Sequence, residues 1–188
     1  MAAYAFEKLD IFGVTPLFAI LLVGLVLPYE SIVISLYYTM KSYNLSNTYW
    51  SLILPQIGLS IPFSIFWLRA SFKAIPKSLS EAAMIEGADR LIILIKILLP
   101  QMIPAILTLT VLLFMWTWNE FLLALIMIQD AEMRTAPLAL SYFAGNKRYG
   151  DPAITAAAAI WVALPVLIIY IFLQRRFISG MVTGAVKE

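Results

Sequence analysis

The chain has 188 residues, of which 62% are hydrophobic and only 13% charged, and its mean hydropathy is +0.90. An ordinary soluble domain carries about 25% charged residues, so this composition excludes a water-soluble fold and indicates a membrane protein. The net charge is only +2 and the basic residues are scattered, which excludes a nucleic-acid-binding surface. The absence of cysteine and histidine excludes disulfides, thiolate nucleophiles and most transition-metal sites.

The first apolar block covers residues 11–38. The ten residues before it have neither a basic segment nor a small-residue cleavage site, so we expect no removable targeting peptide. As one helix the block would be about 42 Å long, which exceeds the ~30 Å of a hydrocarbon core. Pro28 lies inside it and predicts a kink there.

Three further apolar blocks follow, at residues 50–68, 102–128 and 153–173. Pro55 and Pro62 interrupt backbone hydrogen bonds in the second block, and such prolines occur in membrane helices where neighbouring protein satisfies the freed backbone groups. The small run 156–159 in the last block suits close helix packing. No strand-like alternation is present. We therefore predict an all-α fold, a polytopic transmembrane helix bundle of about four spans that forms a single domain over residues 1–188.

The basic residues predict how the chain crosses the membrane. Nine of them fall on one side of the predicted spans and four on the other, and the side richer in Lys and Arg is usually cytoplasmic. This places both termini and the segment 69–100 in the cytoplasm, with residues 41–49 and 129–152 outside. The nine are Lys8, Arg69, Lys73, Lys77, Arg90, Lys96, Arg175, Arg176 and Lys187, and the four are Lys41, Arg134, Lys147 and Arg148.

The segment between the second and third blocks carries the strongest functional pattern. Ser78 and Glu81 have the spacing of a capping box, which predicts a short helix from about Leu79. Small residues then recur over two turns and would let another protein approach the backbone closely; they are Ala82, Ala83, Gly87 and Ala88. This pattern predicts a docking helix. The alternative is a short amphipathic connector on the membrane surface, with alanines that serve helix propensity alone.

Gly87 leaves two geometries open. The short helix can end there, with the glycine at positive φ. It can also continue through the glycine, which the i,i+4 spacing of Glu86 and Arg90 favours. Both geometries put Gly87 at the predicted contact.

The same segment resembles a known motif. Glu81-Ala82-Ala83, three residues, Gly87, nine residues, Ile97, one residue and Leu99-Pro100 resembles the EAA loop of ABC importer permeases at every fixed position. The resemblance implies that the segment 71–100 couples this chain to an ATPase. The coupling residues that it implies are Glu81, Ala82, Ala83, Gly87, Ile97, Leu99 and Pro100.

Other stretches resemble the carbohydrate branch of this family and are similar to the maltose permease MalG; they are residues 27–30, 48–50, 116–121, 133–138 and 174–187. The resemblance implies a sugar-transporting subunit in a bacterial or archaeal cytoplasmic membrane. Its partners would be a second homologous permease, two ABC ATPase subunits and an extracytoplasmic solute-binding protein. Members of this branch typically have six spans, so we expect the first span and most of the second to be missing here.

The resemblance also implies a transport subunit rather than an enzyme. ATP and Mg are expected on the partner ATPase, because this chain has no Gly-rich phosphate loop ending in Gly-Lys-Ser/Thr. We expect no cofactor on this chain.

Polar residues inside apolar blocks are costly in lipid and rarely face it. Five residues are candidates for the solute path, because tryptophan faces can pack against a sugar ring while polar groups bind its hydroxyls; they are Gln56, Trp116, Trp118, Asn119 and Glu120. The alternative is structural: Glu30, which follows Pro28 closely, Asn119 and Glu120 satisfy kinked backbone or tie helices together, and the tryptophans pack the bundle.

The outer loop 144–151 has the length and polarity of a contact with a solute-binding protein, although a plain solvated connector fits as well. The candidate contact residues are Asn146, Lys147, Arg148 and Tyr149.

Three other functions stay open from the sequence. The same loop serves permeases for amino acids, peptides and polyamines. A passive channel would not need a docking helix. A membrane-embedded enzyme would need a nucleophile with a base, or a cluster of ligands, and the sequence shows neither.

Overall fold

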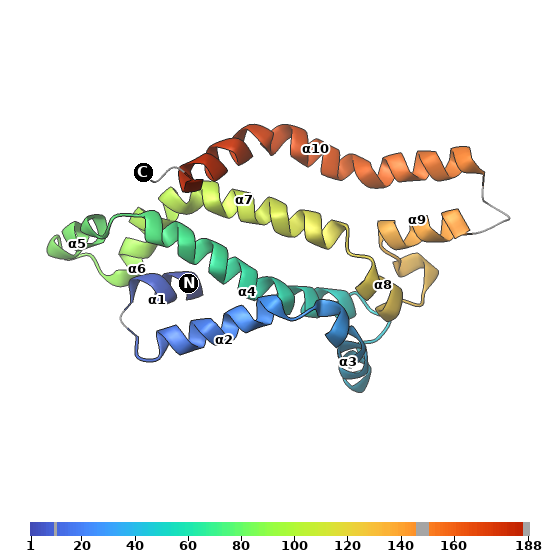
Figure 1. Cartoon of the computed structure of the whole chain (residues 1–188), viewed down its shortest axis with the longest axis horizontal. Helices are drawn as coiled ribbons and strands as arrows, with labels where there is room; N and C mark the ends of the chain where they lie inside the picture. The colour runs from blue at the N-terminus through green and yellow to red at the C-terminus, as the bar shows by residue number, and fades with distance from the viewer. Residues whose placement is uncertain (10, 146–150, 186–188) are drawn as a thin grey trace. The chain divides into compact units, whose positions relative to one another are not determined.

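The structure is a computed structural model that describes the backbone of residues 1–9, 11–145 and 151–185, and side chains up to residue 172. Every regular element in these ranges is a helix (Figure 1). The elements are α1 (Ala2–Lys8), α2 (Val14–Val26), α3 (Tyr29–Ser42), α4 (Trp50–Ala74), α5 (Lys77–Ile85), α6 (Arg90–Ile92), the π-helix η1 (Ile93–Leu98), α7 (Leu99–Trp118), α8 (Leu122–Met127), the 3₁₀ turn η2 (Ala131–Met133), α9 (Ala136–Gly145) and α10 (Pro152–Ala185).

Three helical segments among the described residues are long and apolar enough to cross a membrane: Trp50–Ala74, Arg90–Trp118 and Pro152–Phe172. The bent pair α2 and α3 makes a fourth if it forms one span. Pro28 is the N-cap of α3, with φ −65°, and its missing N–H cannot continue the bonding of α2. The all-α, multi-pass fold and the interruption at Pro28 are therefore confirmed.

The predicted boundaries of two spans were wrong. The helix of the second span runs six residues past Leu68 to Ala74, and so includes Arg69 and Lys73. The third span begins at Arg90 and ends at Trp118, rather than covering 102–128. Apolar residues continue beyond Trp118, but the helix breaks at Asn119 and Glu120 before α8.

Contacts divide the chain into two compact units. Unit 1 comprises Met1–Val26, Leu59–Thr110 and Arg176–Glu188, and unit 2 comprises Leu27–Gly58 and Val111–Arg175. Helices α4, α7 and α10 contribute residues to both units. The single domain predicted from the sequence stays a prediction.

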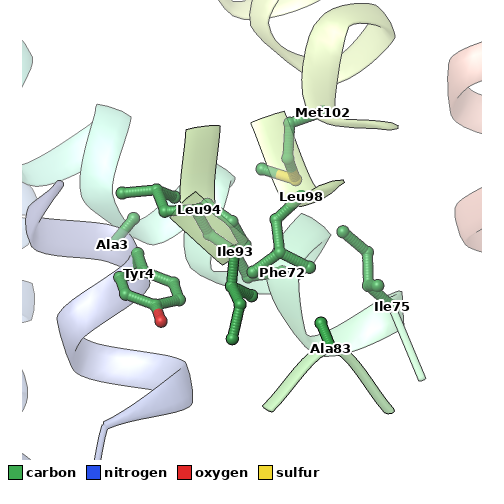
Figure 2. Packing of buried hydrophobic residues seen from close by; sticks show 9 residues of the cluster. All are labelled: Ala3, Tyr4, Phe72, Ile75, Ala83, Ile93, Leu94, Leu98 and Met102. Carbon is green, nitrogen blue, oxygen red and sulfur yellow. The ribbon is translucent and has the colours of Figure 1, made fainter. Parts of the chain in front are cut away.

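Unit 1 has its own apolar core, shown in Figure 2. The π-helix η1 supplies Ile93, Leu94 and Leu98, each no more than 2% exposed. The Tyr4 ring of α1 lies 5.8 Å from the Phe72 ring of α4, and the one buried residue of α5, Ala83, joins the same core. Four elements that are separate in sequence therefore pack on one cluster, which also holds Ala3, Ile75 and Met102.

Unit 2 has a second core, centred on the short helix α8. Leu123, Ala124 and Met127 of α8 are at most 1% exposed. They pack with residues of α3, α4 and α9 and with the residue that follows α8. These other members of the core are Val33, Met40, Leu52, Leu138 and Ile128. The burial of α8 on this scale means that its two ends must find hydrogen-bond partners inside the protein.

Candidate functional site

Helix α5 begins earlier than predicted, and without a capping box. Its first residue is Lys77, its N-cap is Pro76, and no side chain caps it. Proline at that position presets the backbone for a helix start, so Ser78 falls within the first turn rather than before it. Glu81 is the fifth helical residue, beyond the turn where a carboxylate complements the helix dipole. The capping role predicted for these two residues was wrong.

Helix α5 ends at Gly87 in a tight turn. Gly87 has φ +84°, a conformation that side-chain-bearing residues rarely adopt. The Ala88 N–H donates to the Ala83 carbonyl and the Gly87 N–H to the Met84 carbonyl, both at 3.0 Å. This pair of bonds is a Schellman motif. Of the two geometries open at Gly87, the structure therefore has the helix end.

The two faces of α5 have different partners. Ala83 is buried in the core of unit 1, and the Ser80 hydroxyl oxygen on the same side is also buried. Glu81, Ala82 and Ile85 are exposed and lie on the opposite side at helical spacing; we call these three residues the docking face. Ile85 is 88% exposed, and Met84 and Leu79 of the same helix are also exposed. Only part of the predicted contact set is therefore available to a partner, because Ala83 faces its own core.

The turn after α5 leads directly into a long helix. The Asp89 carboxylate accepts a bond of 2.8 Å from the Ile92 N–H and so caps α6. Helix continues through η1 into α7 as the candidate span Arg90–Trp118. Ile97 packs on the core of unit 1, whereas Leu99 and Pro100 are exposed. The predicted coupling residues thus lie on α5 and on the base of a span, joined by one glycine turn.

Glu120 caps the buried helix α8. Its carboxylate oxygens accept from the backbone N–H groups of Leu123 at 2.9 Å and Ala124 at 3.1 Å. The Tyr29 hydroxyl of α3 donates to the same carboxylate at 2.5 Å. Glu120 lies at a helix break, within the range 102–128 that the sequence predicted as one continuous span. These bonds match the structural alternative given for Glu120, and its place on a solute path stays a prediction.

Two of the other candidates for the solute path, Trp118 and Asn119, also make specific contacts. Trp118 donates its indole N–H to the Val162 carbonyl of α10 at 2.9 Å and stacks on Phe114. Asn119 is exposed, and its amide donates to the Met115 carbonyl at 2.7 Å. Trp116 is 53% exposed, and Gln56 is half-buried in α4. Trp118 therefore ties two helices of unit 2 together, and the geometry leaves the roles of Trp116 and Gln56 open.

Sequence reasoning missed Asn47. This residue has φ +56°, and its side-chain oxygen accepts from the N–H groups of Gln129 at 2.9 Å and Asp130 at 3.0 Å. Its own N–H donates to the Met127 carbonyl at 3.1 Å. Asn47 thus holds the C-terminal end of α8. Asparagine is a polar residue that tolerates positive φ, but no local spacing points to a partner 82 positions away.

The remaining candidates give no site in the described residues. Asn146, Lys147, Arg148 and Tyr149 lie outside those residues. No group of three or more acidic side chains that could hold a metal ion occurs in the part of the chain that the structure describes.

Several membrane-spanning helices, with an exposed helix and turn at the base of one of them, define a multi-pass membrane protein. Residues 9–182 match the family described as "Binding-protein-dependent transport system inner membrane component", and the chain belongs to that family.

Individual relatives agree with this membership. The chain is 34% identical to a probable ABC transporter permease protein, YurM, of Bacillus subtilis, over 99% of this chain and 62% of that protein. It is 34% identical to the trehalose transport system permease protein SugB of Mycobacterium tuberculosis, over 100% and 69% respectively. The arabinooligosaccharides transport system permease protein AraQ of Halalkalibacterium halodurans is also 34% identical, over 100% and 66%.

A solved structure also matches. A chain from the crystal structure of a bacterial ABC transporter involved in the import of the acidic polysaccharide alginate matches with a TM-score of 0.72 and 25% identity. That match covers 92% of this chain and 65% of the other. The chain therefore spans about two thirds of the length of the proteins that it resembles.

Proposed function

We propose that this chain acts as a permease subunit of an ATP-binding-cassette importer that moves a carbohydrate across the membrane. A second homologous permease, two ATPase subunits and an extracytoplasmic solute-binding protein would complete the complex. ATP and Mg would bind to the ATPase subunits, and this chain would supply the path and the mechanical connection. Family membership supports the transport role.

The observation that carries the proposal is the construction of the α5 segment. Helix α5 exposes three neighbouring apolar side chains, Leu79 at 38%, Met84 at 51% and Ile85 at 88%, and a group of exposed apolar residues is typical of an interaction surface. The opposite side is packed into the core that also holds the base of the span Arg90–Trp118. A force applied to α5 would therefore reach the span through packed side chains rather than through a loose loop.

Carbohydrate is the solute class that the relatives support. The names of three relatives specify trehalose, arabinooligosaccharides and diacetylchitobiose. Deleting the gene should therefore abolish growth on one carbohydrate as sole carbon source, and the intact gene should restore it. Loss of growth on an amino acid, a peptide or a polyamine instead, with all carbohydrates still used, would contradict the sugar assignment and leave the importer class standing.

The nine-to-four split of basic residues predicts a cytoplasmic α5. Single introduced cysteines can test this location, because the chain has no cysteine of its own. Ser78 and Lys41 are both exposed and are predicted to lie on opposite sides of the membrane. A membrane-impermeant thiol reagent added outside intact cells should label Lys41→Cys but not Ser78→Cys, and both should react after permeabilisation. Labelling at position 78 alone would show that the topology is the inverse of the predicted one, with α5 on the side away from the ATPase.

A further inference from the structure

Helix α1 makes polar contacts with both elements that flank α5. The Lys8 ammonium donates to the Ile75 carbonyl at 2.8 Å. The Glu7 carboxylate accepts from Arg69 Nε of α4 at 2.9 Å. The Tyr4 hydroxyl donates to the Arg90 carbonyl at the start of α6, at a longer 3.5 Å. One short helix therefore reaches the chain just before α5 and just after it.

The Lys8 contact lies at the junction between α4 and α5. Ile75 directly follows the last residue of α4 and directly precedes Pro76, the N-cap of α5. Its carbonyl belongs to the helix end whose acceptors have no partner further along the helix, and a cation there also complements the helix dipole. Burial lowers the pKa of the Lys8 ammonium, while the neighbouring Glu7 carboxylate raises it. Lys8 thus gives up some hydration to hold this junction.

The second contact is reinforced by a ring. The Arg69 guanidinium that bonds to Glu7 also lies 4.0 Å from the centre of the Phe18 ring of α2. The side chains of Arg69 and Glu7 are only 30% and 16% exposed. Arg69 therefore joins α4 to both α1 and α2 within unit 1.

The apolar side of α1 meets the core on which α5 rests. Ala3 is 3% exposed and Tyr4 is 8% exposed, and they share a cluster with Ala83 of α5 and Ile93 of η1. Figure 2 shows Ala3 and Tyr4 within this cluster. Helix α1 covers the core, and its polar residues fasten the chain at either side of α5.

We propose that α1 is a strap that holds the coupling helix α5 rigidly against α4 and the base of the span, with Lys8 as its main positioning residue. The proposal rests on the proposed function, because it assigns to α1 a part in passing motion from an ATPase to the membrane helices. A strap of this kind acts through the rigidity of α5 and touches neither ATP nor solute.

The test compares Lys8→Met with Lys73→Met in the assembled complex. Methionine keeps most of the length of the lysine side chain and removes the donor. Lys73 is an exposed lysine in the last turn of α4, and no hydrogen bond of its side chain occurs within the described residues, so it is the matched control. Lys8→Arg restores a cationic donor and tests rescue.

Two readouts separate a strap from general stability. Ser80→Cys places a thiol where the hydroxyl oxygen is buried, so its rate of modification reports how often α5 leaves its core. With Lys8→Met this rate should rise about tenfold, the scale expected for losing a hydrogen bond to a charged group, and uptake per ATP hydrolysed should fall. Lys73→Met should change neither readout, and Lys8→Arg should restore both.

Each outcome decides the proposal. Loss of ATPase subunits with Lys8→Met, rescued by Lys8→Arg, would also support the strap, since it means that α5 is no longer presented correctly. Unchanged thiol modification, or faster modification with normal uptake per ATP, would overturn it. If Gly87→Leu uncouples the complex while Lys8→Met does not, the docking helix stands and the strap is rejected. If the unaltered complex shows no ATP-driven uptake, the proposed function itself fails.

Discussion

Replacing Gly87 with leucine is expected to lower uptake per ATP hydrolysed by about tenfold, within the range of typical coupling free energies of about 1–3 kcal/mol. Gly87 has φ +84° and forms the turn between α5 and the span that starts at Arg90. A side chain there strains the turn by roughly 1–2 kcal/mol. An added Cβ meets nothing within 4 Å of this chain, so the extra bulk would project towards a docked partner instead. The ratio is measured in proteoliposomes that contain the complete complex.

The chain offers a matched control for this variant. Gly13 has φ +79°, and a Cβ built there also meets nothing within 4 Å, but it lies between α1 and α2 rather than beside α5. Gly13→Leu should therefore carry the same backbone strain and leave uptake per ATP unchanged. Gly87→Asn adds bulk at a residue type that tolerates positive φ, so it separates strain from contact. A normal ratio with Gly87→Leu, in an intact complex, would count against the docking assignment.

Replacing Glu120 with alanine is expected to destabilise the protein by about 3 kcal/mol or more, since unsatisfied buried groups cost about 1–3 kcal/mol each. The variant leaves the N–H groups of Leu123 and Ala124 and the hydroxyl of Tyr29 without their shared acceptor. Helix α8 then loses its cap, although its residues form the centre of the core of unit 2. The thermal unfolding temperature of the purified protein should fall by several degrees.

Two further variants serve as controls for the effect of Glu120→Ala on stability. Glu132 is an exposed carboxylate whose side chain makes no hydrogen bond within the described residues, and Glu132→Ala should leave the unfolding temperature unchanged. Tyr29→Phe removes one of the three bonds to Glu120 and should cost less than Glu120→Ala. An unfolding temperature of Glu120→Ala equal to that of Glu132→Ala would show that the cap contributes little. Lost uptake at normal stability would instead favour the solute-path role.

The sequence predicted features that depend on long apolar patterns and on a specific motif. Blocks of apolar residues identified the spans, because a chain that crosses lipid must satisfy its own backbone hydrogen bonds, and an α-helix does so within one segment. The EAA-like spacing predicted a coupling segment at α5 and Gly87, and this role stays a prediction. The sequence left the geometry of Gly87 open, because local i,i+4 charge pairing and a glycine helix end predicted opposite structures, and the Schellman turn forms.

The failures have physical causes. Ser78 and Glu81 match a capping box by spacing, yet the helix begins at Lys77 with Pro76 as its N-cap, so Ser78 lies inside the first turn and cannot act as the cap. Apolar residues after Trp118 suggested a continuous helix, but α7 ends at Trp118 and the Glu120 carboxylate caps a separate helix, α8. The partners of Asn47 and Lys8 are 82 and 67 positions away, and only the folded chain brings such pairs together.

The most direct test of the account is uptake of labelled carbohydrate by proteoliposomes that contain this chain, its partner permease, the ATPase subunits and the solute-binding protein. The account predicts uptake only when ATP is present on the side of α5 and the binding protein on the other, with Gly87→Leu still hydrolysing ATP but transporting little. Equal uptake with and without ATP, down the solute gradient, would instead identify a passive channel and contradict the central claim.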